Sequence, residues 1–146
     1  MTNHETAERL VEEAGAIAEE MEAACQGSRW NLTVRRAQEV VELSLKGLLK
    51  ALGLEYPRVH DVGDAFVAAV AQKGVVVAPD ALSRIRQVSS YLARDRAPAF
   101  YLEADFSAEQ AQRAQEDAQF VLRLATDLAR QLQAGPRPGT PPTPPP

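Results

Sequence analysis

AQEVVELSLKGLLKALGLEYPRVHDVG, residues 37–63, is the most informative stretch of the chain. Large apolar residues recur along its first half at steps of three and four, which is the spacing of one face of an α-helix. Gly53 is a typical stop for such a helix, and Pro57 favours an extended backbone just before it. Asp61 suits the start of another helix. The stretch therefore predicts a long helix, a short extended connection and a further helix.

The same helical spacing continues on either side of this stretch. Towards the N-terminus the apolar stripe of the long helix begins at Trp30, and Ser28 is in position to cap it. An earlier helix is expected over about residues 5–26, where apolar residues recur with the same period. Beyond the stretch, a shorter helix is expected from residue 61 to about residue 72. The apolar run Val75–Val77 follows, and we interpret it as a loop packed on the helices.

Two further helices are predicted in the second half of the chain. Pro79 occupies a favourable first helical position, and Pro98 is expected to limit the helix that Pro79 opens. Ser107 and Gln110 have the spacing of a capping box, ahead of a last helix that reaches about residue 132. The short connections predict an all-α fold, an up-and-down antiparallel bundle of about five helices, four long and one short.

One domain and one tail are predicted. The chain of 146 residues has the size of a single domain, which we expect to span residues 1–134. Residues 135–146 are rich in proline and contain no core-forming side chain. A disordered or polyproline tail is therefore expected there.

Composition and motif content exclude several classes of protein. No run approaches the roughly 18 apolar residues of a membrane-spanning helix, and the acidic N-terminus lacks the basic start of a signal peptide. We therefore expect a cytoplasmic protein that does not contact a membrane. Cys25 is the only cysteine, which excludes an internal disulfide, and no cysteine or histidine spacing suggests a metal site. No cofactor is expected.

Charge is unevenly distributed along the chain. The formal net charge of −4 argues against indiscriminate binding to nucleic acid. The middle of the chain is nevertheless basic, and a second basic cluster surrounds Asp95, consisting of Arg84, Arg86, Arg94 and Arg96. An anion could bind between this cluster and the basic middle of the chain.

The stretch at residues 37–63 also resembles the signature of the HEPN family, the higher eukaryotes and prokaryotes nucleotide-binding domain. The resemblance lies in the order of an alanine-rich helix, the segment LLKALG, Pro57 and the pair His60–Asp61. It implies a helical hairpin followed by later helices, over about residues 5–132 in this chain. HEPN proteins include ribonuclease toxins, partners of minimal nucleotidyltransferases and domains presumed to bind nucleotides, so the fold by itself does not select a function.

The ribonucleases of that family share an arginine followed after four to six residues by a histidine, and this chain lacks that motif. The positions where His60 would need the arginine are Gly53, Leu54 and Glu55. Attack of an RNA 2′-hydroxyl needs a general acid or base together with a cation for the developing charge, both in fixed geometry. The sequence therefore favours a protein without catalysis of its own, and no catalytic residue is assigned.

The candidate ligand-binding residues fall into two groups, and each has a structural alternative. Lys46 and Lys50 lie one turn apart and could grip a phosphate, or they could belong to a solvated helix face on which Glu42 pairs with Lys46. Arg58 could gather an anion or lie free in solvent. His60 and Asp61 could contact phosphate, or they could satisfy backbone groups at the start of a helix.

The second group lies where the fourth helix is expected to end. Arg94 and Arg96 are suited to bidentate binding of phosphate, or to pairing with nearby acids. Tyr101, with Tyr91 and Phe100, could stack on a base or pack in the core or an interface.

Two hypotheses follow from the sequence. The first is a non-catalytic HEPN accessory domain that binds a nucleotide, or a minimal nucleotidyltransferase-type partner as in a toxin–antitoxin-like pair. The alternative is a divergent, metal-independent ribonuclease toxin, with His60 as acid or base and Arg58, Arg94 or Arg96 as the cation. Homodimerisation is expected chiefly from the resemblance, and RNA is a further candidate ligand.

Overall fold

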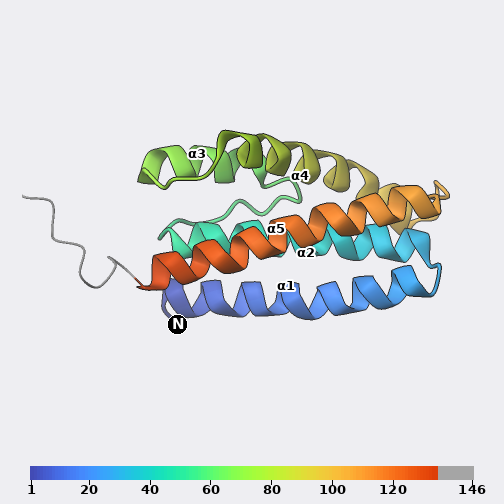
Figure 1. Cartoon of the computed structure of the whole chain (residues 1–146), viewed down its shortest axis with the longest axis horizontal. Coiled ribbons are helices and arrows are strands. Elements are labelled where there is room, and N and C mark those ends of the chain that lie inside the picture. The colour runs from blue at the N-terminus through green and yellow to red at the C-terminus, as the bar shows by residue number, and fades with distance from the viewer. Residues whose placement is uncertain (135–146) are drawn as a thin grey trace, which may run out of the picture.

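The computed structural model describes residues 1–134, and over that range it is a bundle of five helices without a strand (Figure 1). The helices are α1 (Asn3–Gln26), α2 (Trp30–Ala51), α3 (Gly63–Lys73), α4 (Pro79–Phe100) and α5 (Ala108–Ala134). The predicted all-α bundle of four long helices and one short helix is confirmed. The tail predicted at residues 135–146 lies outside the described residues. No helix within residues 1–134 is long and apolar enough to cross a membrane.

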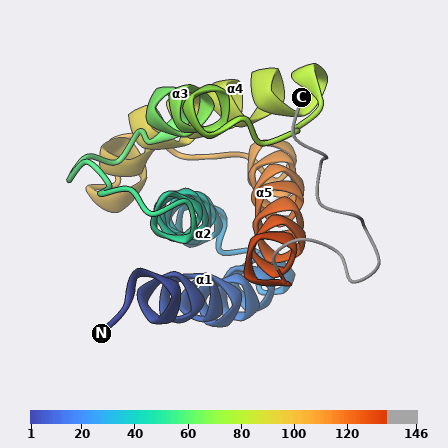
Figure 2. The same cartoon turned by 90° about the vertical axis from the view of Figure 1, so that its left-hand side faces the viewer.

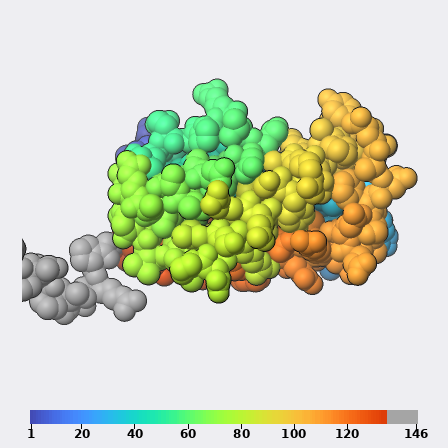
Figure 3. Space-filling view, turned by 90° about the horizontal axis from the view of Figure 1, so that it is seen from above, coloured from blue at the N-terminus to red at the C-terminus, as the bar shows by residue number. Residues whose placement is uncertain are grey.

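The helix α2 is the centre of the bundle. Viewed along its axis, α2 is surrounded by α1, by α5 and by the layer that α3 and α4 form (Figure 2). From above, α3 and α4 cover one face of the molecule, beside the α2–α3 connection (Figure 3). Gly47 lets α1 approach closely, since a Cβ atom at that position would lie 2.9 Å from a methyl group of Val11. Because α2 is covered on several sides, even its polar residues are largely buried and need partners inside the protein.

The start of α2 differs from the prediction. Ser28 does not cap the helix: its φ is +59°, and its backbone N–H donates to the Cys25 carbonyl within the turn between α1 and α2. Arg29 takes the N-cap position without a side-chain hydrogen bond. The Thr33 hydroxyl instead donates to the Arg29 carbonyl at 2.8 Å. The connection is so tight that the residue predicted as the cap is used to turn the chain.

The end of α4 also differs from the prediction, because the helix continues through Pro98 to Phe100. Asn31 of α2 holds this end in place. Its Nδ2 donates to the carbonyls of Ala99 and Ala104, at 3.3 and 2.8 Å, and its Oδ1 accepts from the N–H of Phe106 at 3.0 Å. Contacts with α2 therefore hold the end of α4 in place beyond Pro98, although the proline removes one hydrogen bond of the helix.

Two other local predictions are confirmed. In the capping box, the Ser107 N–H donates to Oε1 of Gln110 at 2.8 Å, and the Gln110 N–H donates to the Ser107 hydroxyl at 3.1 Å. In the α3–α4 connection, Val75 and Val77 pack against the core, whereas Val76 between them is 93% exposed.

Candidate functional site

Polar residues of the central helix form the base of the candidate site. Gln38 is buried, at 1% exposure, and its amide is bonded in two directions. Its Nε2 donates to the Glu42 carboxylate at 2.9 Å and lies 3.5 Å from the His60 carbonyl oxygen. Its Oε1 accepts a hydrogen bond from Nη1 of Arg96 at 2.6 Å. One buried amide therefore connects α2, the α2–α3 connection and α4.

Arg96 is held by an acid as well as by this amide. Its Nη1 lies 3.8 Å from Oε2 of Glu39, and the other oxygen of Glu39 accepts from Arg36 at 2.7 Å. The Arg96 side chain keeps 31% of its surface exposed. The contacts with Gln38 and Glu39 therefore fix the direction of the guanidinium, and its exposed part remains accessible to a ligand.

Glu42 connects His60 to Lys46. One carboxylate oxygen lies 2.7 Å from Nδ1 of His60, and the other accepts from Nζ of Lys46 at 2.8 Å, which confirms the predicted pairing within the helix. Burial raises the pKa of Glu42, but hydrogen bonds from Gln38, Lys46 and His60 outweigh that effect, so the pKa lies below the ordinary value of 4.5. An ionised Glu42 therefore fixes the imidazole ring through Nδ1 and leaves Nε2 available to a ligand.

His60 and Arg96, which are far apart in the sequence, line the same pocket. It has a volume of about 330 Å³, and the other lining residues are Ala93, Ala97, Phe100 and Tyr101. The two aromatic rings meet edge to face, with centroids 4.9 Å apart, and they are 52% and 69% exposed. The Arg35 guanidinium lies 4.7 Å from the centroid of the Phe100 ring. We call this pocket the His60–Arg96 pocket; it combines cations with exposed rings on which a planar group can stack.

Lys46 and Lys50 do not line this pocket. Their side chains are only 10% and 11% exposed, and their ammonium groups lie 5.2 and 5.7 Å from the centroid of the Tyr56 ring. Lys50 also pairs with Glu55 at 2.8 Å. Both lysines therefore hold the α2–α3 connection against α2 rather than facing solvent.

Asp61 is occupied at the start of α3. Its Oδ1 accepts from the Ser89 hydroxyl at 2.7 Å and from the Gly63 N–H at 3.2 Å. The two helices meet closely here, since a Cβ atom on Gly63 would lie 3.1 Å from Cα of Arg86. The helix begins at Gly63, two residues later than predicted, and Asp61 fastens it to α4. Arg58 lies exposed in the connection before it and makes no ion pair within residues 1–134.

Arg94 lies on another face of α4, because two residues along a helix correspond to a rotation of about 200°. It lines two pockets, of about 390 and 480 Å³, which it shares with Tyr91 and Gln87. Its side chain is 73% exposed, and its one ion pair within residues 1–134 is with Asp95, at 3.2 Å. The Tyr91 hydroxyl donates to Asp117 at 2.6 Å. Burial and this carboxylate raise the pKa of Tyr91 above its ordinary value of 10, so the hydroxyl remains a donor. The structure therefore separates Arg94 from Arg96.

The sequence interpretation did not include Gln38 and Glu39 among the site residues, and it took Glu42 only as a partner of Lys46. The available signal was a polar row at i, i+4 and i+8, formed by Gln38, Glu42 and Lys46. On a helix that is open on one side such a row faces solvent. Here it is covered by the α2–α3 connection and by α4. Within residues 1–134, no group of three or more His, Cys, Asp or Glu residues is placed to hold a metal ion.

Two comparisons with known proteins give a match to this chain. The crystal structure of an archaeal HEPN homologue shares the fold, with a TM-score of 0.51 at 20% sequence identity, over 88% of this chain and 95% of that chain. Among curated proteins, none matches this chain. The family model of the HEPN domain matches residues 7–128. This match covers nearly the whole bundle and confirms the resemblance found in residues 37–63: the chain belongs to the HEPN domain family.

Proposed function

We propose that this HEPN domain binds a nucleotide in the His60–Arg96 pocket and has no catalytic activity of its own. The observation that carries the proposal is the pairing of a fixed histidine and a fixed arginine beside two exposed aromatic rings, in a pocket of about 330 Å³. The absence of an arginine four to six residues before His60 favours binding over catalysis.

The pocket offers groups for the phosphate and for the base of a nucleotide. The Arg96 guanidinium is suited to a phosphate, because guanidinium groups form bidentate, charge-assisted hydrogen bonds with phosphate oxygens. A protonated His60 would donate from Nε2 to the same phosphate, since Nδ1 is engaged by Glu42 at 2.7 Å. The exposed ring of Tyr101 is suited to stacking on the base. Lys46, Lys50 and Asp61 do not contact the nucleotide. They hold the α2–α3 connection and the start of α3 in place beside the pocket.

Titration of the purified chain with AMP and ATP by isothermal calorimetry tests the proposal. We expect saturable binding that weakens about tenfold or more in Arg96→Gln, because one charge-assisted hydrogen bond contributes about 1.5–3 kcal/mol. Arg94→Gln is the matched control, since the same change on another face of α4 should leave the affinity unchanged. Absence of saturable binding, or equal losses in the two variants, would contradict the proposed site.

A second candidate function is the metal-independent ribonuclease. It is favoured by one observation: Glu42 orients His60 at 2.7 Å, and the Arg96 cation lines the same pocket, so an acid–base group and a charge-stabilising group lie together. Labelled single-stranded RNA incubated without added metal distinguishes the two functions. Cleavage that His60→Ala abolishes would establish the ribonuclease and overturn the accessory role. Growth arrest when this chain is expressed alone would favour the toxin.

The accessory role includes two interactions with proteins. One is with a partner of the minimal nucleotidyltransferase type, which other HEPN domains bind, and the other is self-association into a homodimer. Co-expression with a nucleotidyltransferase encoded beside this chain, followed by co-purification, tests the first. A stoichiometric complex supports the toxin–antitoxin-like pair, and separate elution of the two proteins contradicts it.

A further inference from the structure

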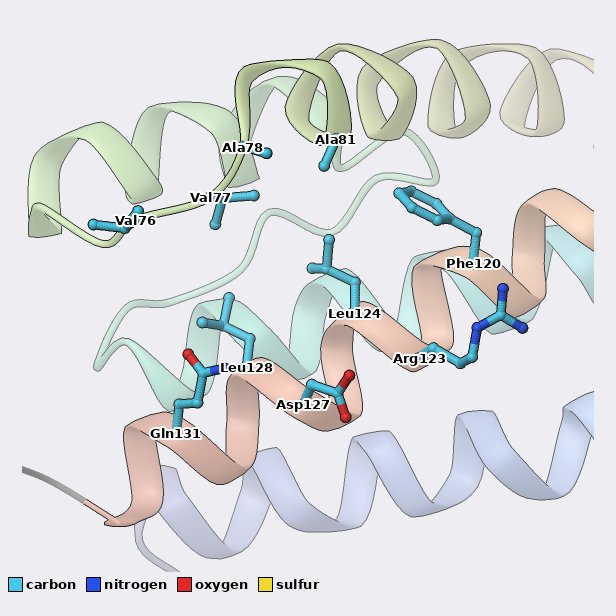
Figure 4. Close-up of a pocket in the computed structure, with 10 residues that line it drawn as sticks. All are labelled: Val76, Val77, Ala78, Ala81, Phe120, Arg123, Leu124, Asp127, Leu128 and Gln131. Atoms are coloured by element: carbon cyan, nitrogen blue, oxygen red, sulfur yellow. The ribbon is translucent and has the colours of Figure 1, made fainter. Parts of the chain in front are cut away.

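A groove runs along the C-terminal half of α5, between that helix and the α3–α4 connection (Figure 4). Its volume is about 390 Å³, and most of the residues that line it are apolar. Figure 4 shows Leu124 and Leu128 pointing from α5 towards Val77, and Val76 at the edge of the groove is 93% exposed. We call it the α5 groove. It shares no lining residue with the His60–Arg96 pocket.

The proline-rich tail of the chain begins at one end of this groove. The last lining residue on α5 is Gln131, and the helix ends three residues later, at Ala134. Gly135 and Pro136 follow, a pair that suits a reversal of the chain, because glycine turns without strain and proline cannot continue a helix. Residues 135–146 lie outside the described residues, and seven of these twelve are proline. A proline-rich segment is therefore tethered beside an apolar groove.

The chemistry of the groove suits such a segment. Polyproline chains present apolar rings together with backbone carbonyls that have no internal hydrogen bonds, and they dock on apolar grooves that contain aromatic side chains. The α5 groove offers the Phe120 ring for the prolines, and the side chains of Arg123 and Gln131 as donors to the carbonyls. The Arg84 guanidinium lies 3.9 Å from the centroid of the Phe120 ring. This contact holds the ring in place at the edge of the groove.

Two contacts between the tail and the groove agree on one register. Measured back along α5 from Gly135, Asp127 lies about 12 Å away and Phe120 about 22 Å away, at the rise of an α-helix. In a polyproline segment that returns along the helix, Arg137 lies about 6 Å and Pro142 about 22 Å from Gly135. The long side chain of Arg137 spans the remaining distance to Asp127, which is exposed and forms no ion pair within residues 1–134. The agreement of both spacings, and not the charge alone, supports this occupant.

We propose that residues 136–142 of the same chain occupy the α5 groove and run back along α5, with Arg137 at Asp127 and Pro142 at Phe120. The docked tail removes the apolar lining of the groove from water and makes the groove unavailable to another protein. This surface is separate from the His60–Arg96 pocket, so nucleotide binding and tail docking stand or fall independently.

Nuclear magnetic resonance on the isotope-labelled full chain tests the docking directly. We expect nuclear Overhauser contacts between the protons of Pro142 and those of the Phe120 ring. Changing Pro141→Gly and Pro142→Gly together should remove these contacts, because the segment then loses its rings and its polyproline preference. Changing Pro145→Gly and Pro146→Gly together is the matched control and should leave the contacts unchanged, since those residues lie beyond Phe120 in this register. All four positions lie outside the bundle, so the fold is retained in both variants.

Charge reversal tests the second contact. The methyl chemical shifts of Leu124 report the ratio of docked to free tail. Arg137→Asp should lower that ratio about threefold, because a repulsion replaces an exposed ion pair. Asp127→Arg should have the same effect, and the two changes combined in one chain should restore the original ratio. Glu13→Arg, at an exposed site on α1, is the control and should leave the ratio unchanged.

Three outcomes would overturn the proposal. The first is the absence of contacts between the tail and the α5 groove in the original chain. The second is an equal effect of the two pairs of proline substitutions, because the register would then be wrong. The third is a docked fraction that rises with protein concentration, since the occupant would then be the tail of another copy. Calorimetry with AMP on the same variants reports on nucleotide binding independently.

Discussion

Two faces of α4 each carry an arginine, and the two arginines differ in what supports them. On one face, Arg96 donates to the buried amide of Gln38, and that amide also holds Glu42. On the other face, Arg94 pairs with Asp95, its neighbour in the chain, and remains 73% exposed. The comparison shows that a buried partner, rather than the arginine itself, gives a surface cation a defined direction. A fixed cation is suited to recognising one ligand geometry, whereas a free cation only contributes charge.

The largest expected effect comes from removing the buried partner. Gln38→Leu leaves Arg96 and Glu42 without their shared hydrogen bonds inside the protein, so the free energy of unfolding should fall by about 2–4 kcal/mol. Urea denaturation measures this. The matched control is Gln115→Leu, because the buried Oε1 of Gln115 has no hydrogen-bond partner among residues 1–134, and its loss should be close to neutral. Similar losses of unfolding free energy in the two variants would show that Gln38 contributes through packing and not through its hydrogen bonds.

A smaller, pH-dependent effect is expected for Glu42. Its pKa in the folded state lies below the ordinary 4.5, so its contribution to stability is fully present above pH 4.5 and is lost as the pH falls through the lowered pKa. Glu42→Gln should lower the free energy of unfolding at pH 7 by about 1–2 kcal/mol, since two charge-assisted contacts weaken. The deficit relative to the original chain should shrink as the pH is lowered from 5 towards 3. A deficit independent of pH would exclude this role.

Tyr91 provides the corresponding test on the Arg94 face. Tyr91→Phe removes a hydrogen bond of 2.6 Å to Asp117, but the carboxylate keeps Arg84 at 3.1 Å. The free energy of unfolding should fall by about 1 kcal/mol, less than for Gln38→Leu. The affinity for AMP should not change, because Tyr91 does not line the His60–Arg96 pocket. A drop in affinity would mean that the two faces of α4 are coupled.

The smallest effect is expected at Ser44, which lies on α2 as Gln38 does but whose buried hydroxyl has no hydrogen-bond partner in the part of the chain that the structure describes. Ser44→Ala should therefore be neutral or stabilise the chain by up to about 1 kcal/mol. Thermal unfolding followed by circular dichroism measures this change. A clear loss of stability would mean that the hydroxyl has a partner, such as a bound water molecule.

The helices could be predicted from the sequence because their signals are local. The apolar spacing along residues 37–52 and the Ser107–Gln110 capping box each depend on a few neighbouring residues. Ser28 and Pro98 were predicted wrongly because distant contacts, or the shortness of a turn, decide their roles. The Asn31 side chain, for example, is what ties down the end of α4 beyond Pro98.

The candidate site could be predicted only in part, because helical spacing gives the face of a residue and not what covers that face. His60, Arg96 and Tyr101 line one pocket, although the sequence placed His60 in a different group of candidates from Arg96 and Tyr101. Lys46 has the spacing of a solvated residue, yet the α2–α3 connection folds over it. Which helix covers another is decided by the packing of the whole bundle, and this information is spread over the entire chain.

The Asn31 side chain has a consequence for the folding kinetics. Its three hydrogen bonds join residues that are 68, 73 and 75 positions apart, whereas α1 and α2 are neighbours joined by a short turn. Contacts over such separations carry a larger loop-closure cost and tend to form after local ones. In stopped-flow experiments, Asn31→Ala should therefore speed unfolding while refolding stays nearly unchanged. The Asn31 contacts then form after the main folding barrier and slow the unfolding of the bundle.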